Sequence, residues 1–155
     1  MNTYLEKFIN EKFKKPGKAL DLGAGRFYDV VYLKYLGWKC EGVDKITGVD
    51  LEKAYKSKKA PFDLVYSNYV LQKLKNKKFF IKTAYDNLGK GGWLFIHTFD
   101  KSDKNTHLGI DKGKLVGILE NQGFVDVENA VFSFYDNHLG HKHWHKILQI
   151  TARKL

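Results

Sequence analysis

Apolar and polar positions along the chain follow two periods, which predict helices and strands in alternation. A helical spacing over residues 4–13 is broken by the triplet Lys15-Pro16-Gly17, and an apolar strand is predicted over residues 18–22. A second helical spacing covers residues 28–36 and ends at Gly37. The apolar positions of this second helix that are expected to cover a sheet are Val30, Val31, Leu33 and Tyr35 or Leu36.

The alternation continues through the rest of the chain. Strands are predicted over residues 38–43, 61–68 and 93–99, and helices over residues 78–87 and 111–121. The apolar set of the helix over 78–87 is Phe79, Phe80, Ile81, Ala84 and Leu88. The glycine-rich residues 89–92 are predicted to form a loop. Two last apolar stretches, 124–135 and 145–152, are separated by turn residues 136–140, which predicts an antiparallel hairpin.

The segment between Asp44 and Asp50 is too short to connect two parallel strands. Such a crossover needs about 10–12 residues, whereas these two residues are six positions apart. Either the next strand is absent or residues 46–49 form a short irregular edge, and residues 51–58 are predicted to form one or two helical turns. The predicted fold class is therefore α/β: a Rossmann-like, doubly wound, mostly parallel sheet with an antiparallel C-terminal hairpin and a shortened or missing edge strand.

Length and composition predict one globular domain. The chain has 155 residues, 43% of them hydrophobic and 28% charged, which is ordinary for such a domain. It contains no apolar stretch of about 18 residues, and its first residues lack the layout of a signal peptide. The single cysteine, Cys40, excludes an intramolecular disulfide and fits a reducing compartment. These features predict a cytoplasmic protein with no membrane partner.

The charge is strongly basic, since Lys+Arg 27 minus Asp+Glu 17 gives +10. Such an excess is typical of proteins with a polyanionic partner. Here it consists mostly of lysines spread over predicted helix faces, and the two arginines are Arg26 and Arg153. Arginine is the usual residue for bidentate phosphate or guanine contacts. A lysine-biased solvated surface and a nucleic-acid partner both remain open, and the solvated surface is favoured.

The strand over 18–22 ends in the turn Asp21-Leu22-Gly23-Ala24-Gly25. Glycines there allow a positive φ and a close backbone approach, and the next helix presents unpaired N–H groups. Asp44 ends the following strand about 20 residues later, where βαβ nucleotide sites place a carboxylate against ribose hydroxyls. The pattern predicts a nucleotide site, and its alternative is an ordinary strand-to-helix turn.

The order of these motifs resembles the class I S-adenosylmethionine-dependent methyltransferases, most closely the small-molecule and tellurite-resistance-like branch. The matching segments are Leu20-Asp21-Leu22-Gly23-Ala24-Gly25, Gly42-Val43-Asp44, Asp50-Leu51, and residues 62–71, 88–94 and 150–154. The resemblance implies a mostly parallel seven-stranded sheet whose last strand is antiparallel. It also implies S-adenosyl-L-methionine as cofactor and methyl transfer as the activity.

The resemblance also implies roles for individual residues. Asp21 would orient the cofactor's amino group, and Asp44 would bind the ribose hydroxyls with Lys45 beside it. The residues implied to approach the methionine and ribose are Gly23, Ala24 and Gly25; those flanking the adenine are Asp50 and Leu51; and those on the floor are Ser67, Asn68 and Tyr69. Phe27 stands where the family has a third glycine. Phe27 and the short segment after Asp44 keep a non-catalytic cofactor-binding module open as an alternative.

The catalytic residue stays unassigned. The candidates are Tyr69, His107, His141 and His143, with His97 also near the expected acceptor. His141, His143 and His145 alternate, so on a strand they share one face. Such a face can hold a metal, act as a base or contact substrate, or form a plain polar hairpin end. No metal site is assigned.

The predicted partner is a small-molecule methyl acceptor. RNA or another polyanion is the less favoured acceptor, because Ser67-Asn68-Tyr69-Val70 stands where amino-group nucleic-acid methylases have Asn/Asp-Pro-Pro-aromatic. Within the single domain, residues 1–17 form a short N-terminal helix, 18–99 the cofactor half and 100–155 the substrate side. The short N-terminal segment leaves the acceptor pocket open or completed by a second copy in a homodimer.

Overall fold

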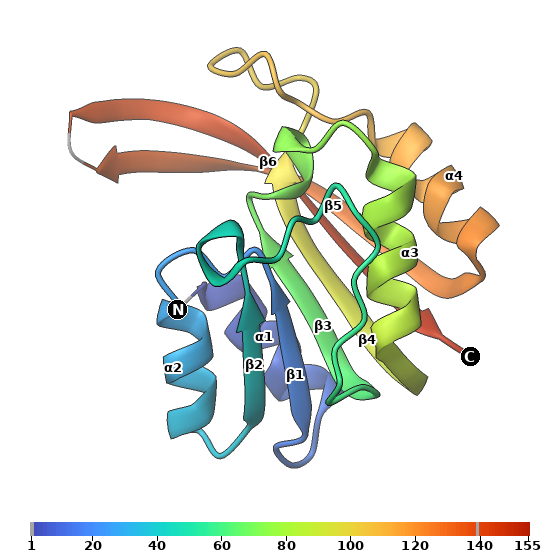
Figure 1. Cartoon of the computed structure of the whole chain (residues 1–155). Helices are drawn as coiled ribbons and strands as arrows, with labels where there is room; N and C mark the ends of the chain where they lie inside the picture. The colour runs from blue at the N-terminus through green and yellow to red at the C-terminus, as the bar shows by residue number, and fades with distance from the viewer. Residues whose placement is uncertain (1, 139) are drawn as a thin grey trace.

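The computed structural model describes residues 2–138 and 140–155, and the side chains of His138 and His141 lie outside the described part. Within these residues the strands form one six-stranded sheet in the order β2-β1-β3-β4-β6-β5 (Figure 1). The elements are α1 Thr3–Lys12, β1 Lys18–Leu22, α2 Tyr28–Tyr35, β2 Lys39–Val43, η1 Lys45–Thr47, β3 Phe62–Asn68, η2 Leu71–Lys73, α3 Lys77–Asn87, β4 Leu88–Phe99, α4 Lys112–Gln122, β5 Phe124–His138 and β6 His141–Lys154.

The sheet topology confirms the predicted fold class. β1 pairs in parallel with β2 and β3, and β3 pairs in parallel with β4. β6 runs antiparallel to both β4 and β5. Because side chains alternate across a strand, the sheet has two apolar faces. One face packs on α1 and α2, and the other packs on α3 and α4 (Figure 1).

Two expectations about helix faces are wrong. In α2, Val30 and Leu33 are buried, but Val31 and Tyr35 are 64% and 85% exposed. A helix of about two turns presents only one narrow stripe to the sheet, and these two residues lie outside it. In α3, Phe79 is 43% exposed for the same reason.

The glycine-rich residues 89–92 are not a loop but part of β4, which begins at the buried Leu88. The register between β3 and β4 shifts between Phe62 and Leu64, so the glycines accommodate an irregularity within the strand pairing. Gly91 has φ +76, which glycine adopts without strain. The pattern alone could not separate a glycine-rich loop from a bulged strand.

Residues 51–58 form turns, and no helix is present there in the described chain. Two backbone N–H groups of this segment bond to α3 side chains: Tyr55 N donates to Thr83 Oγ1 at 3.4 Å, and Ser57 N donates to Asn87 Oδ1 at 2.9 Å. The short segment after Asp44 forms the 3₁₀ turn η1, capped by Asp44 and Thr47. Of the two predicted outcomes, an absent strand and a short irregular edge, the described chain shows the absent strand.

The C-terminal hairpin is longer than predicted. Its strands reach His138 and begin again at His141, and Figure 1 shows this end of β5 and β6 projecting beyond the rest of the sheet. Gly123, with φ +101, ends α4 as predicted. Among the described residues, the helices are all too short or too polar to cross a bilayer.

Candidate functional site

The turn after β1 is fixed by its contact with β2. The backbone N–H groups of Gly23 and Ala24 both donate to the carbonyl of Val43, at 2.8 and 3.0 Å. Gly23 has φ +91, and a Cβ at this position would overlap the Cγ2 atom of Val70. Glycine is therefore required at position 23 both by conformation and by space.

We expect Gly23→Ala to lower the free energy of unfolding by roughly 1–3 kcal/mol, from backbone strain alone, and by more from the overlap with Val70. Gly25→Ala is the matched control, because φ is +51 there but nothing lies within 4 Å of a Cβ. Urea unfolding of both variants measures the difference. Equal losses would show that the contact with Val70 costs nothing.

Asp44 lies at the carboxyl end of β2 with both carboxylate oxygens directed at backbone N–H groups. Oδ2 accepts from Gly25 N at 3.0 Å and Oδ1 accepts from Ile46 N at 3.3 Å. The carboxylate thus joins the glycine turn to η1. An ionised carboxylate has further acceptor sites on each oxygen, so Asp44 can also accept hydroxyl donors from a ligand.

A hollow of about 280 Å³ opens beside this turn. Four of the residues singled out from the sequence line it, namely Gly23, Asp44, Lys45 and Leu51. The lining residues that sequence reasoning missed are Val49, Glu52, Val70, Lys73 and Leu74. The last three come from the segment around η2, whose apolar residues at helical spacing were the available signal. Asp50 accepts a bond from the backbone N–H of Glu52 at 3.1 Å.

Phe27 does not fill this hollow. Its backbone is left-handed, with φ +64, and its ring packs below the turn against β2. A Cβ at Gly42 would lie 2.8 Å from Phe27 Cε1. The absence of a side chain at Gly42 therefore provides the room for the ring, and Gly23 stays accessible from the hollow.

Asp21, in β1 just before the turn, is 4% exposed. Burial raises its pKa to about 8, and the nearby charges of Asp29 and Asp44 act in the same direction, whereas a hydrogen bond with Tyr66 opposes them. At neutral pH most of the molecules therefore carry a protonated Asp21. No sequence motif indicates this raised pKa, because its cause is the surrounding core.

Ser67 and Asn68 end β3 beside Asp21. Ser67 Oγ donates to the carbonyl of Leu22 at 2.7 Å, which joins β3 to the end of β1. Asn68 Nδ2 donates to Asp29 Oδ2 at 2.9 Å, and Asn68 Oδ1 accepts from Asn2 Nδ2 at the same distance. Asn2, which sequence reasoning missed, thereby links the start of α1 to the end of β3.

Tyr69 follows with φ +57, and its ring lies 5.3 Å from that of Phe99. Burial raises the pKa of Tyr69 to about 12, with smaller contributions from Tyr4 and from the charge of Asp136 on β5. His97 lies behind it, and burial lowers the pKa of His97 to about 4 against the effect of its bond to Gln149. This imidazole is therefore neutral at physiological pH.

The tautomer of His97 follows from its two partners. Nδ1 lies 3.0 Å from Asn2 Nδ2, which can only donate, and Nε2 lies 2.8 Å from Gln149 Oε1, which can only accept. His97 thus carries its proton on Nε2. With both nitrogens engaged and the ring buried, His97 supports the site and cannot serve as its base.

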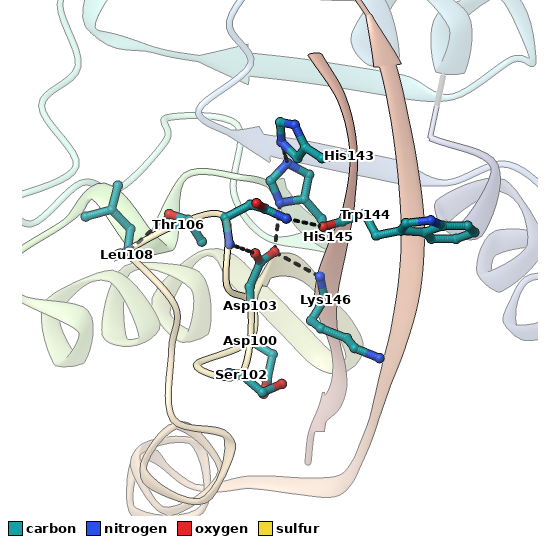
Figure 2. Close-up of polar contacts among 10 residues, drawn as sticks. Asp100, Ser102, Asp103, Thr106, Leu108, His143, Trp144, His145 and Lys146 are labelled. Atoms are coloured by element: carbon teal, nitrogen blue, oxygen red, sulfur yellow. Dashed lines mark hydrogen bonds and ion pairs between the residues drawn. The ribbon is translucent and has the colours of Figure 1, made fainter.

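Figure 2 shows a second polar cluster, in which the loop over 100–110 meets β6. The fully buried carboxylate of Asp103 accepts from His145 Nδ1 at 2.7 Å and from Lys146 N at 2.8 Å through Oδ2, and from Asn105 N at 2.7 Å through Oδ1. Burial raises the pKa of Asp103, but these hydrogen bonds outweigh burial and hold the pKa below its ordinary value. Asp103 is therefore ionised.

The Asp103 carboxylate determines the direction of the hydrogen bonds along the two imidazoles next to it. His145 must present an N–H from Nδ1, so a neutral His145 has its lone pair on Nε2. His143 Nε2 lies 2.9 Å from that atom, and so donates to it. The three side chains form a hydrogen-bonded Asp103–His145–His143 chain, with His143 at the end away from the buried carboxylate.

The chain lies on the same side of the sheet as Tyr69. His143 and His145 share one face of β6 with Gln149, the partner of His97. The ring of His145 lies 4.7 Å from that of Phe99, tilted by 39°, and Phe99 in turn contacts Tyr69. Phe99 thus connects His145 with Tyr69.

The remaining histidine candidates lie elsewhere. His107 is exposed in the loop over 100–110. The side chain of His141 lies outside the described residues. Among the side chains that the structure describes, no three His, Cys, Asp or Glu groups converge to hold a metal ion.

Comparison with known proteins gives a family and a fold. Residues 1–145 match a family model described as a methyltransferase domain. Comparison with curated proteins gives no match. Among solved structures, an S-adenosylmethionine-dependent methyltransferase from Archaeoglobus fulgidus matches with a TM-score of 0.71 and 18% identity, covering 98% of this chain and 92% of that chain.

Two further structures are similar. Phosphoethanolamine N-methyltransferase 2 of Haemonchus contortus, in complex with S-adenosyl-L-methionine, has a TM-score of 0.76 and 15% identity over 99% of this chain. The match covers 52% of that protein, so the chain spans about half its length. The 1,6-didemethyltoxoflavin-N1-methyltransferase of Burkholderia thailandensis, with its substrate and S-adenosylhomocysteine, has a TM-score of 0.69 and 19% identity, covering 96% and 75% of the two chains.

Proposed function

Because the chain belongs to the methyltransferase-domain family, we propose that it is an S-adenosylmethionine-dependent methyltransferase acting on a small molecule. The observation that carries this proposal is the hollow at the carboxyl ends of β1 and β2, bounded by Gly23 and Asp44. Ligands of open α/β sheets bind at this edge. The motif order favours the small-molecule, tellurite-resistance-like branch, and the lone Cys40 favours a cytoplasmic location.

The residues of the hollow fit the cofactor. The bare backbone at Gly23 admits it closely, and Asp44 offers acceptors for ribose hydroxyls while Lys45 and Leu51 line the adenine side. Asp21 and Asn68 lie at the methionine side, where a carboxyl and an amide can orient an amino-acid group. When bound, the cofactor supplies an electrophilic methyl group on a sulfonium.

The acceptor side supports a small-molecule substrate. Tyr69 lies near Tyr4 and Asp136, both of which raise its pKa, so aromatic and acidic side chains meet on the proposed acceptor side. His143 lies opposite Asp136 in the hairpin register. Two of the similar structures are methyltransferases named for small acceptors, phosphoethanolamine and 1,6-didemethyltoxoflavin. We propose that His143 takes the proton of an acceptor that must lose one.

The test of the cofactor assignment is a thermal melt with S-adenosylmethionine, S-adenosylhomocysteine and, as a control, NAD. A ligand at 100 times its Kd that binds only the folded state adds about 2.7 kcal/mol, or several degrees for a domain of this size. We expect both sulfur nucleosides to raise the melting temperature and NAD to leave it unchanged. No shift at millimolar cofactor would contradict the proposal.

We expect Asp44→Ala to weaken S-adenosylmethionine binding about 10- to 100-fold, because one lost hydrogen bond to a charged group costs about 1.5–3 kcal/mol. Calorimetric titration measures the loss. Glu120→Ala, at an exposed position of α4, is the control that removes an equal charge away from the hollow. Asp44→Asn keeps one side-chain oxygen that can accept from the backbone N–H of Gly25 or Ile46. Comparing it with Asp44→Ala separates the loss of ribose contacts from a disturbance of the turn. Full affinity in Asp44→Ala would remove Asp44 from the site.

A further inference from the structure

Lysines gather around two adjoining hollows on one edge of the molecule. The larger, of about 630 Å³, is lined by Lys18, Lys34, Lys39, Lys58 and Lys59. The smaller, of about 330 Å³, is lined by Lys12, Lys14, Lys15 and Lys90. The hollows adjoin, because Lys18 N of the larger one donates to Asp63 Oδ2 of the smaller one at 2.7 Å, and the rings of Phe13 and Trp38 lie 5.1 Å apart. We call these nine lysines the lysine face.

Little acidic charge offsets the lysine face. The acidic residues that line the two hollows are Glu41 and Asp63. Glu41 accepts hydrogen bonds from Tyr55 and Ser57, and lies 3.6 Å from Lys59 Nζ. Asp63 accepts from the backbone N–H of Lys18 at 2.7 Å. Both carboxylates are committed to the fold, so the lysine face carries a net positive charge.

The lysine face lies at the opposite end of the sheet from the proposed cofactor site. Lys18 and Lys39 are the first residues of β1 and β2, whereas Gly23 and Asp44 directly follow their last residues. A five-residue parallel strand spans roughly 16 Å. Figure 1 shows β1 and β2 running in the same direction, so their first and last residues lie at opposite edges of the sheet. A partner on the lysine face does not enter the methyl-transfer site.

We propose that the lysine face binds a nucleic acid through its phosphate backbone. Clustered lysines are the electrostatic footprint of such binding, and they contact phosphates as point charges. The described lining contains no arginine, the usual residue for reading guanine, so binding is independent of sequence. A single strand can enter the hollowed surface, whereas a planar lipid surface meets only its rim. This inference is independent of the proposed methyl transfer.

The experiment measures fluorescence anisotropy of a labelled, mixed-sequence RNA of about 20 nucleotides, at salt concentrations from about 50 to 200 mM. We expect the logarithm of the binding constant to fall linearly with the logarithm of the salt concentration, and each phosphate contact to add about 0.7 to the magnitude of the slope. The variant Lys34→Gln/Lys39→Gln/Lys58→Gln removes three exposed lysines of the larger hollow. It should bind at least tenfold more weakly and lose about 2 from the magnitude of the slope.

The matched control is Lys104→Gln/Lys112→Gln/Lys114→Gln, which removes three exposed lysines from the loop before α4 and from its first turn. Both variants carry the same net charge, so the control separates the lysine face from charge in general. It should bind RNA like the original protein. Equal losses in the two variants, or no RNA binding at 50 mM salt, would overturn the proposal.

Two further measurements complete the test. Vesicles rich in phosphatidylserine offer the alternative polyanion, and binding to them without binding to RNA would also overturn the proposal. Thermal melts confirm that both variants fold. S-Adenosylmethionine affinity should be equal in all three proteins, so a failure of the cofactor assignment is distinguishable from a failure of the lysine face.

Discussion

Replacing His143 with glutamine lowers the rate of methyl transfer at least about 100-fold for an acceptor that must lose a proton, because a positioned general base contributes roughly that much. When bound, S-adenosylmethionine would supply the methyl carbon to the acceptor's lone pair and would keep the electrons of the broken carbon–sulfur bond on sulfur. We propose that the acceptor's proton passes to the imidazole of His143. The resulting positive charge is stabilised through His145 by the ionised Asp103.

The measurement is release of S-adenosylhomocysteine, with an amine or phenol identified in an acceptor screen. His107→Gln is the control, since this exposed imidazole lies in the loop and outside the cluster. S-Adenosylmethionine affinity should be unchanged in His143→Gln. A rate within about twofold of the original would transfer the role of base to Tyr69, which Tyr69→Phe then tests.

Asp103 acts through His145, as a positioning residue. We expect Asp103→Asn to lower kcat with little change in KM, because the amide can donate to His145 and favour the opposite tautomer. Asp103→Glu, which restores the carboxylate, should recover part of the rate. A purely structural role would instead lower the melting temperature of both variants and leave kcat intact.

Asp21 makes the stability of the fold depend on pH. The pKa of its carboxyl is about 8 in the folded protein, mainly through burial, and 3.8 in the unfolded chain. Between these values the folded state holds a proton that the unfolded state has released. The contribution of Asp21 to the free energy of unfolding is thus most favourable below about pH 4, and it is lost as the pH rises to about 8.

The free energy of unfolding is expected to change by about 1.4 kcal/mol per pH unit, or roughly 6 kcal/mol over the whole interval. Asp21→Asn carries no such proton, so its stability relative to the original protein should increase as the pH rises from about 4 to 8. Urea unfolding at a series of pH values measures this difference. A constant difference would show that Asp21 ionises normally despite its burial.

The same proton couples to cofactor binding. If a cationic amino group pairs with Asp21, the carboxyl must first release its proton, so affinity for S-adenosylmethionine should rise between pH 6 and 8 by at most about tenfold per pH unit. Calorimetric titration of Asp21→Asn should show no such rise. A flat profile in the original protein would indicate that Asp21 binds the cofactor in its protonated form.

The sequence predicted the parts of the site that depend on local pattern. A strand, a glycine turn and a helix specify where Gly23 lies, and the next strand specifies where Asp44 lies. The alternation of His143 and His145 correctly predicted one shared face. In each case the spacing along the chain determines the geometry, because neighbouring residues belong to one regular element.

Contacts between distant segments were not predictable in this way. Asn2 reaches Asn68 and His97 only because α1 packs across the sheet. Asp103 reaches His145 only because a loop folds back on β6. Contacts with a distant segment also hold residues 51–58, where side chains of α3 accept hydrogen bonds from the backbone N–H groups of Tyr55 and Ser57.

The packing of Phe27 on Gly42 couples two positions that motif searches treat separately. A Cβ at position 42 would press on the ring of Phe27 and on the side chain of Val30, each at 2.8 Å. Since the Cβ of Ala24 lies at the same distance, a larger residue 42 requires changes at residues 24, 27 and 30 together, and the ring at position 27 is permitted only while position 42 is bare. A sequence motif that requires a glycine at position 27 would miss chains with Phe27 and Gly42, whereas a motif that accepts glycine at either position 27 or position 42 would find them.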